Sequence, residues 1–361
     1  MDALLGLTGV LGIIIGLIWI VVGLVRKGPL KIPSIVLVFA ILLFSAGLAM
    51  PPAADQQDEG SGPAGDSGPA VENGVAEEPE VGETGEVAGE KEPADSGQEG
   101  SAADSRAPPS GRLEVHFIDV GQGDAILVKT PGKNILIDAG WRGDTVVNYL
   151  RSEGVESLDL VIGTHPHADH IGGLINVMEQ ISVREVFDPG VVHTTKTFED
   201  YLTVIDQKNI IFTEGRTGLE RDIGGGAVLE IIHPSSPSED HLNNASIVAR
   251  VAFGQISFLF TGDAEKEAEG EILNRGYNPE STILKVGHHG SSTSTTQAFL
   301  RAVNPEAAVI MCGEDNQYGH PHEETVDRLT AAGVDIYRTD LHGTIVISTD
   351  GQSYSVERAG R

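Results

Sequence analysis

The sequence predicts an α/β (α+β) fold in which two β-sheets pack face to face and helices cover both outer surfaces, an αββα four-layer sandwich. Two observations predict it. From residue 113 onward, short runs rich in β-branched residues alternate with helix-like segments. Strand meanders and β/α units also occur twice, once in each half of this region, which is typical of two sheets that share a core. A two-helix transmembrane hairpin and a disordered linker are expected to precede the sandwich.

The net charge of −29 over 361 residues is unevenly distributed and divides the chain into three regions. Residues 1–50 carry a net charge of +2, residues 51–111 carry −13, and residues 112–361 carry the remaining −18. The last region is long enough to bury a full hydrophobic core. We therefore predict a membrane anchor over 1–50, a linker over 51–111 and one folded domain over 112–361.

Residues 3–25 and 32–50 are uncharged apolar runs of 23 and 19 residues. Each is long enough to cross a bilayer, since a helix needs about 20 apolar residues to do so. The connecting loop holds the three basic residues of the first fifty, which places it in the cytoplasm and the rest of the chain outside. A cleaved signal peptide, which needs only one apolar region of about 7–15 residues, and a buried core hairpin are the alternatives.

The linker, residues 51–111, contains fifteen acidic and two basic residues and is otherwise rich in Pro, Gly and Ser. It has little to bury and is expected to be disordered, with a reach of roughly 40 Å. A partner-binding role is the alternative to a solvated tether. No protein partner can be predicted from it.

Composition also limits the kind of protein. The acidity excludes a general basic surface for nucleic acid, but bound metal ions can supply local positive charge for a phosphodiester. A single cysteine, Cys312, excludes an intrachain disulfide framework and a cysteine-cluster metal site.

In the first half of the domain, Gly-containing turns separate three strands, and a helix with Asp144 as its N-cap follows. A buried strand and a helix come next, and then two strands with a helix between them. In order, these are strands 113–120, 124–130 and 133–140, helix 144–153, strand 158–164, helix 171–180, strand 183–187, helix 198–207 and strand 209–213.

The second half has the same order of elements as the first. A meander of three strands is followed by alternating helices and strands, and further strands end the domain. The elements of this half are strands 227–233, 246–253 and 255–263, helix 265–274, strand 282–286, helix 295–303, strand 307–311, helix 323–332, and strands 335–339, 343–349 and 353–357.

The chemistry is concentrated where strand 158–164 ends, in the run HPHADH over 165–170. His165 and His167, two residues apart on an extended turn, can face one metal, while Asp169 and His170 on the next turn can serve a second. A surface histidine cluster with no function is a poor explanation for this pattern.

Further candidate ligands follow other strands. Asp138 closes the third strand and Asp263 closes strand 255–263, while His288 and His289 follow strand 282–286. A carboxylate such as Asp263 has two oxygens and can bridge two cations, with His288 or His289 completing the second site. An aspartate at the end of a strand is often only a cap. The prediction of a metal site therefore rests on these residues together with the HPHADH run.

These residues resemble the metallo-β-lactamase superfamily, through THPHADH, the preceding IDAG and the later TGD. Longer phrases are similar to the C-terminal hydrolase domain of the ComEC family of DNA-uptake competence proteins: FIDVGQGDAILV, LNNASIV, LFTGDAE, LKVGHHGSSTS, YGHPH and RTDLHGTI. The similarity covers roughly residues 113–356 and implies the αββα sandwich of the metallo-β-lactamase type.

The resemblance also implies a ligand set: one metal on His165 and His167, a second on Asp169 and His170, Asp263 as the bridge and Asp138 as an orienting residue. The chain departs from the superfamily at the third ligand of the first metal, where a histidine is usual and Asn244 stands near His233 and His241. One or two divalent ions are expected, zinc or manganese. The harder ligand set that Asn244 would give favours manganese.

Four late histidines, His288, His289, His320 and His322, compete to complete the second metal and to protonate a leaving group. We predict His288 and His320 for these two roles and Asp169 as the residue that also orients the nucleophile. His289 remains an uncertain ligand, His342 is expected to be structural and Cys312 to be a buried apolar residue. The loop 290–295 is either a phosphate cradle or a solvated loop.

The predicted function is that of a membrane-anchored metal-dependent hydrolase outside the cytoplasm, a phosphodiesterase or nuclease that uses metal-bound hydroxide on DNA or a small phosphodiester. The charge of −18 argues against tight nonspecific binding of DNA. Two helices cannot build a DNA channel, so a role in DNA uptake does not follow. The alternatives are hydrolysis of a small ester, lactone, thioester or β-lactam and, least favoured, an inactive tethered binding module.

Overall fold

A computed structural model describes residues 108–237 and 239–360. The predicted anchor over 1–50 and nearly all of the predicted linker lie outside these residues. Within the described part of the chain, no helix is both long and apolar enough to cross a membrane.

The first sheet has eight strands in the order β17-β16-β1-β2-β3-β5-β7-β8. Its antiparallel part is the predicted opening meander, extended at one edge by the last two strands of the chain, and its other strands run parallel to β3. The strands are β1 (Leu113–Phe117), β2 (Ala125–Thr130), β3 (Lys133–Ala139), β5 (Leu160–Ile162), β7 (Glu185–Asp188), β8 (Ile211–Glu214), β16 (Ile345–Thr349) and β17 (Tyr354–Arg358).

The second sheet has seven strands in the order β15-β14-β13-β12-β11-β10-β9. It too begins as an antiparallel meander and continues with parallel strands, here from β12 to β15. Its strands are β9 (Glu220–Asp222), β10 (Val228–His233), β11 (Val248–Phe253), β12 (Ile256–Phe260), β13 (Ile283–Lys285), β14 (Ala307–Ile310) and β15 (Asp335–Arg338). Short strands β4 (Ser157–Leu158) and β6 (Ser182–Val183) pair separately, and β4 and β9 were not predicted.

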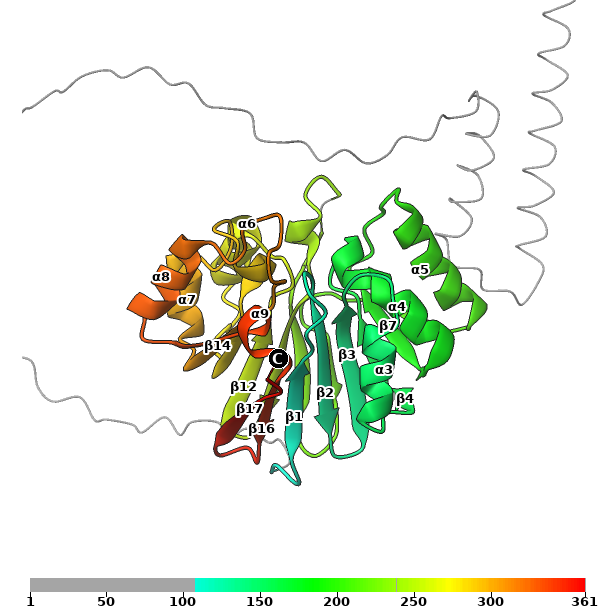
Figure 1. Cartoon of the computed structure of the whole chain (residues 1–361), viewed down its shortest axis with the longest axis horizontal. Coiled ribbons are helices and arrows are strands. Elements are labelled where there is room, and N and C mark those ends of the chain that lie inside the picture. Colours follow the sequence, from blue (N-terminus) through cyan, green and yellow to red (C-terminus); the bar gives the residue numbers. More distant parts are fainter. Residues whose placement is uncertain (1–107, 238, 361) are drawn as a thin grey trace, which may run out of the picture. The chain divides into compact units, whose positions relative to one another are not determined.

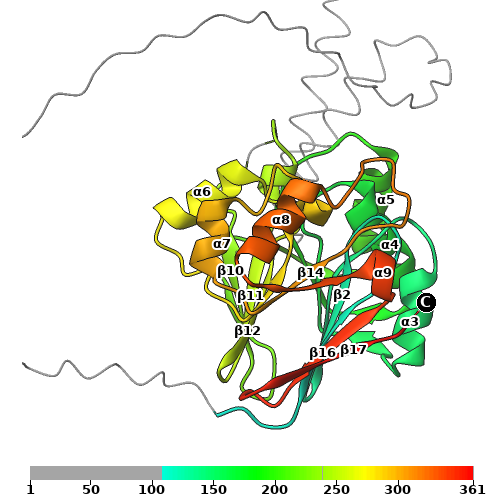
Figure 2. The ribbon, with the colours of Figure 1, turned by 60° about the vertical axis from the view of Figure 1, so that its left-hand side comes forward.

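Helices cover the two outer faces, as Figures 1 and 2 show. One set, α3 (Thr145–Ser152), α4 (Ala168–Gln180) and α5 (Lys196–Gln207), packs on the first sheet. The other set, α6 (Lys266–Asn274), α7 (Gln297–Val303) and α8 (Glu323–Ala331), packs on the second sheet. A short helix, α9 (Thr339–His342), precedes β16.

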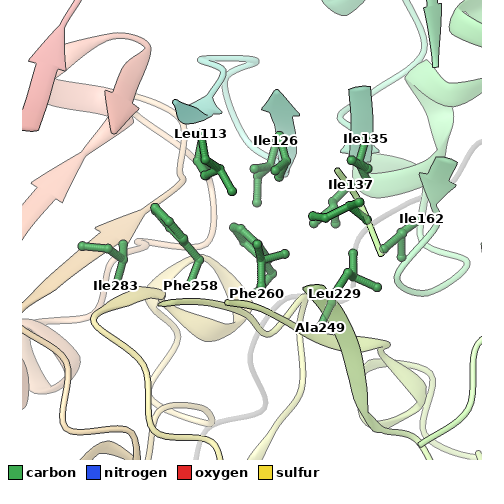
Figure 3. Close-up of a cluster of buried hydrophobic side chains, with 14 of the residues drawn as sticks. Leu113, Ile126, Ile135, Ile137, Ile162, Leu229, Ala249, Phe258, Phe260 and Ile283 are labelled. Atoms are coloured by element: carbon green, nitrogen blue, oxygen red, sulfur yellow. The ribbon is translucent and has the colours of Figure 1, made fainter. Parts of the chain in front are cut away.

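Strand alternation explains the layering. Ile126 and Ile137 point into the core between the sheets, whereas Leu127 and Leu136 point outward to α3, α4 and α5. Figure 3 shows side chains of the first sheet, such as Ile126, meeting those of the second, such as Phe260. The predicted αββα sandwich is therefore confirmed for the described residues.

Candidate metal centre

The candidate ligands come from loops that follow β5, β12 and β13. Helix α4 begins at Ala168, three residues earlier than the predicted start at 171. Asp169 and His170 therefore lie in its first turn, while His165 and His167 lie on the extended segment before it. His165 and His170 are almost completely buried.

A first group consists of His165, His167 and Asp263, whose potential ligand atoms all lie within 4.8 Å of one another. Nε2 of His165 is 3.0 Å from Nδ1 of His167 and 3.8 Å from Oδ2 of Asp263. The two histidines thus face the same point, as the HxH spacing predicted.

A second group surrounds the same oxygen of Asp263. Oδ2 of Asp263 is 3.2 Å from Nε2 of His170 and 3.5 Å from Nε2 of His289. These two nitrogens are 3.3 Å apart. Oδ2 of Asp169 approaches the same point, at 3.4 Å from Nε2 of His289. Asp124 completes this second group, since its potential ligand atom lies within 4.8 Å of those of His170, Asp263 and His289. Asp263 is therefore shared between the two groups.

The donor set fits divalent cations. His170 donates from Nδ1 to Asp138 and His289 donates from Nδ1 to the carbonyl oxygen of Met311, so Nε2 is the atom that each ring has available for a metal. Oδ1 of Asp263 is buried and has no hydrogen-bond partner. Two Nε2 atoms that converge on a buried carboxylate with one unpartnered oxygen are an arrangement that a bound cation satisfies.

The electrostatics agree with this assignment. Burial alone would lower the pKa of His170, yet Asp263, Asp138 and Asp169 raise it well above its usual range. The pKa of His289 is raised in the same way, mainly by Asp263. The carboxylates therefore create a strong demand for positive charge at this point, which divalent ions supply when bound.

Asp138 lies behind His170. Its Oδ2 accepts a 2.8 Å hydrogen bond from Nδ1 of His170 and a 2.7 Å bond from the Thr164 hydroxyl, while Oδ1 accepts from the Thr164 amide at 2.8 Å. The residue lies near the end of β3 and has a left-handed backbone, with φ of 55°, a conformation that the surrounding contacts must hold in place. This geometry orients the His170 ring toward Asp263.

Replacing Asp138 by Ala is expected to weaken metal binding by about 10–100-fold, because the His170 ring loses the partner that fixes its orientation and tautomer. Titration of the variant with Mn²⁺, followed calorimetrically, measures this. Wild-type affinity in Asp138→Ala would show that the ring is oriented by packing alone.

His288 and His289 are adjacent but face different surroundings. Both have left-handed backbones, with φ of 49° and 55°. His289 is buried in the second group, whereas Nδ1 of His288 lies 3.2 Å from Glu265 and Nε2 of His288 is 3.8 Å from Oδ2 of Asp263. The geometry favours His289 as the ligand and leaves His288, 23% exposed, at the rim of the site.

His320 lies beside this rim. Its ring centroid is 5.5 Å from that of His288 and 6.2 Å from that of His289. Asn316 holds the loop by bonding both the amide and the carbonyl of His320. Burial, together with His289 and His288, lowers the pKa of His320 to about 4. It is neutral at pH 7, which suits hydrogen bonding to a substrate better than donation of a proton.

Asn244 is placed as a helix cap. Its carbonyl oxygen accepts hydrogen bonds from the amides of Glu265 and Ala268, at 3.0 and 3.3 Å, at the start of α6. His233 donates from Nδ1 to the carbonyl of Ser246, and His241 is exposed. None of the three belongs to either group, so the first group contains His165, His167 and Asp263 alone.

The loop 290–295 does not offer a phosphate cradle. The Thr295 and Thr296 amides bind the buried Glu269 carboxylate, and the Ser292 amide donates to Nδ1 of His322. The other donors are also occupied within the loop and its surroundings. That half of the prediction is wrong, because donors that already bind the protein are not free for a ligand.

Two further predictions concern residues near the centre. Nδ1 of His342 accepts a hydrogen bond from the Arg338 amide at 3.1 Å, which is a structural role. Cys312 is buried, as expected. Thr339 bonds both its amide and its carbonyl, which secures the end of β14 that carries Met311.

Sequence reasoning missed Asp124 and Lys285. Asp124 belongs to a buried group with His170, Asp263 and His289, and Lys285 contacts its carboxylate. Both residues lie inside segments on which the family resemblance rests, DVGQGDA and LKVGHH. The lysine in the otherwise apolar strand 283–285 was the sequence signal that could have identified Lys285 as functional.

Comparison with known proteins identifies the family. Residues 118–314 match the family model of the metallo-beta-lactamase superfamily. ComE operon protein 3 of Bacillus subtilis is 33% identical over 253 residues, which cover 64% of this chain and 32% of that protein. Competence protein ComA of Neisseria gonorrhoeae is 31% identical over 243 residues, covering 66% and 33%.

The chain thus spans about a third of the length of these curated relatives. Among solved structures, Igni18, a metallo hydrolase from Ignicoccus hospitalis, is similar at 19% identity and a TM-score of 0.45, over 64% of this chain and 98% of that one. The resemblance to competence proteins of the ComEC type is confirmed. The chain belongs to the metallo-β-lactamase superfamily and is a metal-dependent hydrolase with relatives of the ComEC type.

Proposed function

We propose that the protein is a membrane-anchored phosphodiesterase or nuclease that acts outside the cytoplasm. The observation that carries the chemistry is the sharing of Asp263 between two groups of ligand atoms. Divalent ions held there, Zn²⁺ or Mn²⁺, would supply a hydroxide nucleophile at neutral pH and neutralise charge on the reacting phosphate.

The surrounding residues support this role. Asp169 is 18% exposed in its side chain, so one carboxylate of the centre meets solvent where a nucleophile has to be oriented. His288 and His320 lie side by side next to the centre, with ring centroids 5.5 Å apart and with Nδ1 of His320 buried and unpartnered. These imidazoles are suited to bind the leaving-group side of a substrate through hydrogen bonds.

The location rests on the sequence. Two apolar runs with a basic loop between them support a membrane anchor with the domain outside. The names of the curated relatives, which include competence proteins, support a nucleic acid substrate. Hydrolysis of a small ester, lactone, thioester or β-lactam is the second candidate. Asn244 counts against the β-lactam, because it caps α6 where the superfamily usually has a third histidine ligand.

A substrate panel tests the proposal. The purified full chain is loaded with Mn²⁺ or Zn²⁺ and given bis(p-nitrophenyl) phosphate, single-stranded DNA and a chromogenic cephalosporin. We expect hydrolysis of the two phosphodiesters and none of the cephalosporin. Cleavage of the cephalosporin alone would favour the second candidate, and inactivity on phosphodiesters with every metal would refute the proposal.

A further inference from the structure

Lys285, the last residue of β13, is completely buried next to the metal centre. Its ammonium group contacts Oδ2 of Asp124, donates a 2.9 Å hydrogen bond to the carbonyl of Gly262, and lies 4.0 Å from Oδ1 of Asp263. Among the described residues, it is the only buried lysine or arginine. A charge in such a place is costly unless it is fully paired, so its presence calls for an explanation.

Asp124 faces the back of the histidine ligands. Its Oδ1 is 3.4 Å from Nδ1 of His289, and its Oδ2 is 4.0 Å from Nδ1 of His170. Those Nδ1 atoms already bind Met311 and Asp138. The Nε2 atoms, which converge on Asp263, are approached on their own side by Asp169. Asp124 belongs to the same buried cluster of potential ligand atoms, and its Oδ1 has no hydrogen-bond partner. Its contacts with the two rings are to their Nδ1 atoms, on the side away from the Nε2 atoms that converge on Asp263.

We propose that Lys285 is a positioning residue of the metal centre that acts through Asp124 and through the turn that carries Asp263. One ammonium group ties the loop before β2, which holds Asp124, to the Gly262–Asp263 turn after β12. The inference rests on the metal centre of the proposed function. In this inference Asp124 supports His170 and His289 from their Nδ1 side and does not itself bind the metal, which the variants below test.

The backbone around Gly262 shows why such a tie is needed. Gly262 has a left-handed φ of 51°, and a Cβ there would lie 3.0 Å from Thr164. The turn is held on the other side by Ser246, whose hydroxyl accepts a 3.1 Å hydrogen bond from the Asp263 amide. Lys285 binds the Gly262 carbonyl directly, so it fixes the direction in which the Asp263 carboxylate leaves the turn.

A paired set of variants separates positioning from simple stabilisation of the fold. Lys285→Met leaves Asp124 buried and unpaired, whereas Asp124→Asn with Lys285→Met removes both charges. Removing both members of a buried pair is often neutral for stability, while removing one is not. The full chain and its variants are compared by the thermal unfolding midpoint of the metal-free protein and by Mn²⁺ affinity from calorimetry.

We expect Lys285→Met to lower the midpoint and to weaken Mn²⁺ binding about 10–100-fold, the usual effect of losing a residue that supports a ligand. In the double variant the midpoint should recover while Mn²⁺ binding stays weak. Asp124→Asn alone should lose affinity to a similar extent. Lys129→Met, which breaks the partly buried pair with Glu153, is the control and should bind Mn²⁺ like wild type.

Recovery of Mn²⁺ affinity in the double variant would overturn the inference, since the pair would then serve only the fold. A loss in Asp124→Asn far larger than in Lys285→Met would also overturn it, because Asp124 would then be a ligand. If Lys285→Met does not fold, the double variant decides whether the pair serves only the fold. The loss in Asp124→Asn, compared with the expected loss of about 10–100-fold, then decides whether Asp124 is a ligand. A wild-type chain that binds Mn²⁺ but cleaves no phosphodiester would refute the proposed function and leave this inference standing.

Discussion

Replacing Asp263 by Asn is expected to lower kcat/KM for bis(p-nitrophenyl) phosphate by at least about 10³-fold. Oδ2 of Asp263 is the atom that both ligand groups share, at 3.2 Å from His170 and 3.8 Å from His165. The amide has almost the same shape but no charge, so the variant isolates the carboxylate. Several kcal/mol of transition-state stabilisation depend on the ions that it helps to hold, and each 1.36 kcal/mol is a tenfold change in rate.

Metal content measured on the same samples checks the cause. Asp263→Asn should retain fewer bound ions after dialysis than wild type. Asp144→Asn is the matched control, since Asp144 lies at the start of α3 and its carboxylate accepts hydrogen bonds from the side chains of Asn176 and Gln180. Equal activity of Asp263→Asn and wild type would show that the two groups do not act through a shared carboxylate.

Replacing Gly173 by Ala is expected to destabilise the domain by roughly 3 kcal/mol and to weaken metal binding. A Cβ at Gly173 would lie 2.1 Å from the carbonyl oxygen of Ala139, an atom of the backbone that cannot move without shifting β3. Helix α4 would have to move away from the sheet, and His170 lies in its first turn. Thermal or denaturant unfolding and Mn²⁺ titration measure the two effects.

Gly270 provides the matched control in another helix. It lies inside α6, and a Cβ there meets nothing within 4 Å. Gly270→Ala should therefore stabilise the protein by about 0.5–1 kcal/mol, because alanine reduces the entropy lost on helix formation. A Gly173→Ala variant as stable as wild type would contradict this prediction. It would show that the position of the HPHADH segment does not depend on close packing of α4 on β3.

Much of the fold was predictable because it depends on periodic patterns. Alternating residues of a strand, such as Ile126, Leu127 and Val128, lie on opposite faces of the sheet. This placement is local and does not depend on residues distant in the sequence. The helix start at Ala168 was placed too late, because HPHADH is polar and gives no apolar period until Ile171. Strands β4 and β9 are two and three residues long, too short to show a pattern.

The candidate site was predictable where the ligands are close in sequence. His165 and His167 need only the spacing of an extended segment to face one point. Which of His288 and His289 faces the metal centre depends on the left-handed backbone of both residues. Residues other than glycine rarely adopt this conformation, so the sequence gives no sign of it. The cap made by Asn244 and the pair of Asp124 with Lys285 join segments far apart in the chain, so only the folded structure brings them together.

The most direct test of the metal centre is the anomalous difference density of crystals of the protein grown with Mn²⁺. We expect density between His165, His167 and Asp263, and density between Asp169, His170, His289 and Asp263, with Asp263 contacting both. Density bound to Asp124 on the Lys285 side of the rings, or no density at these residues, would contradict it.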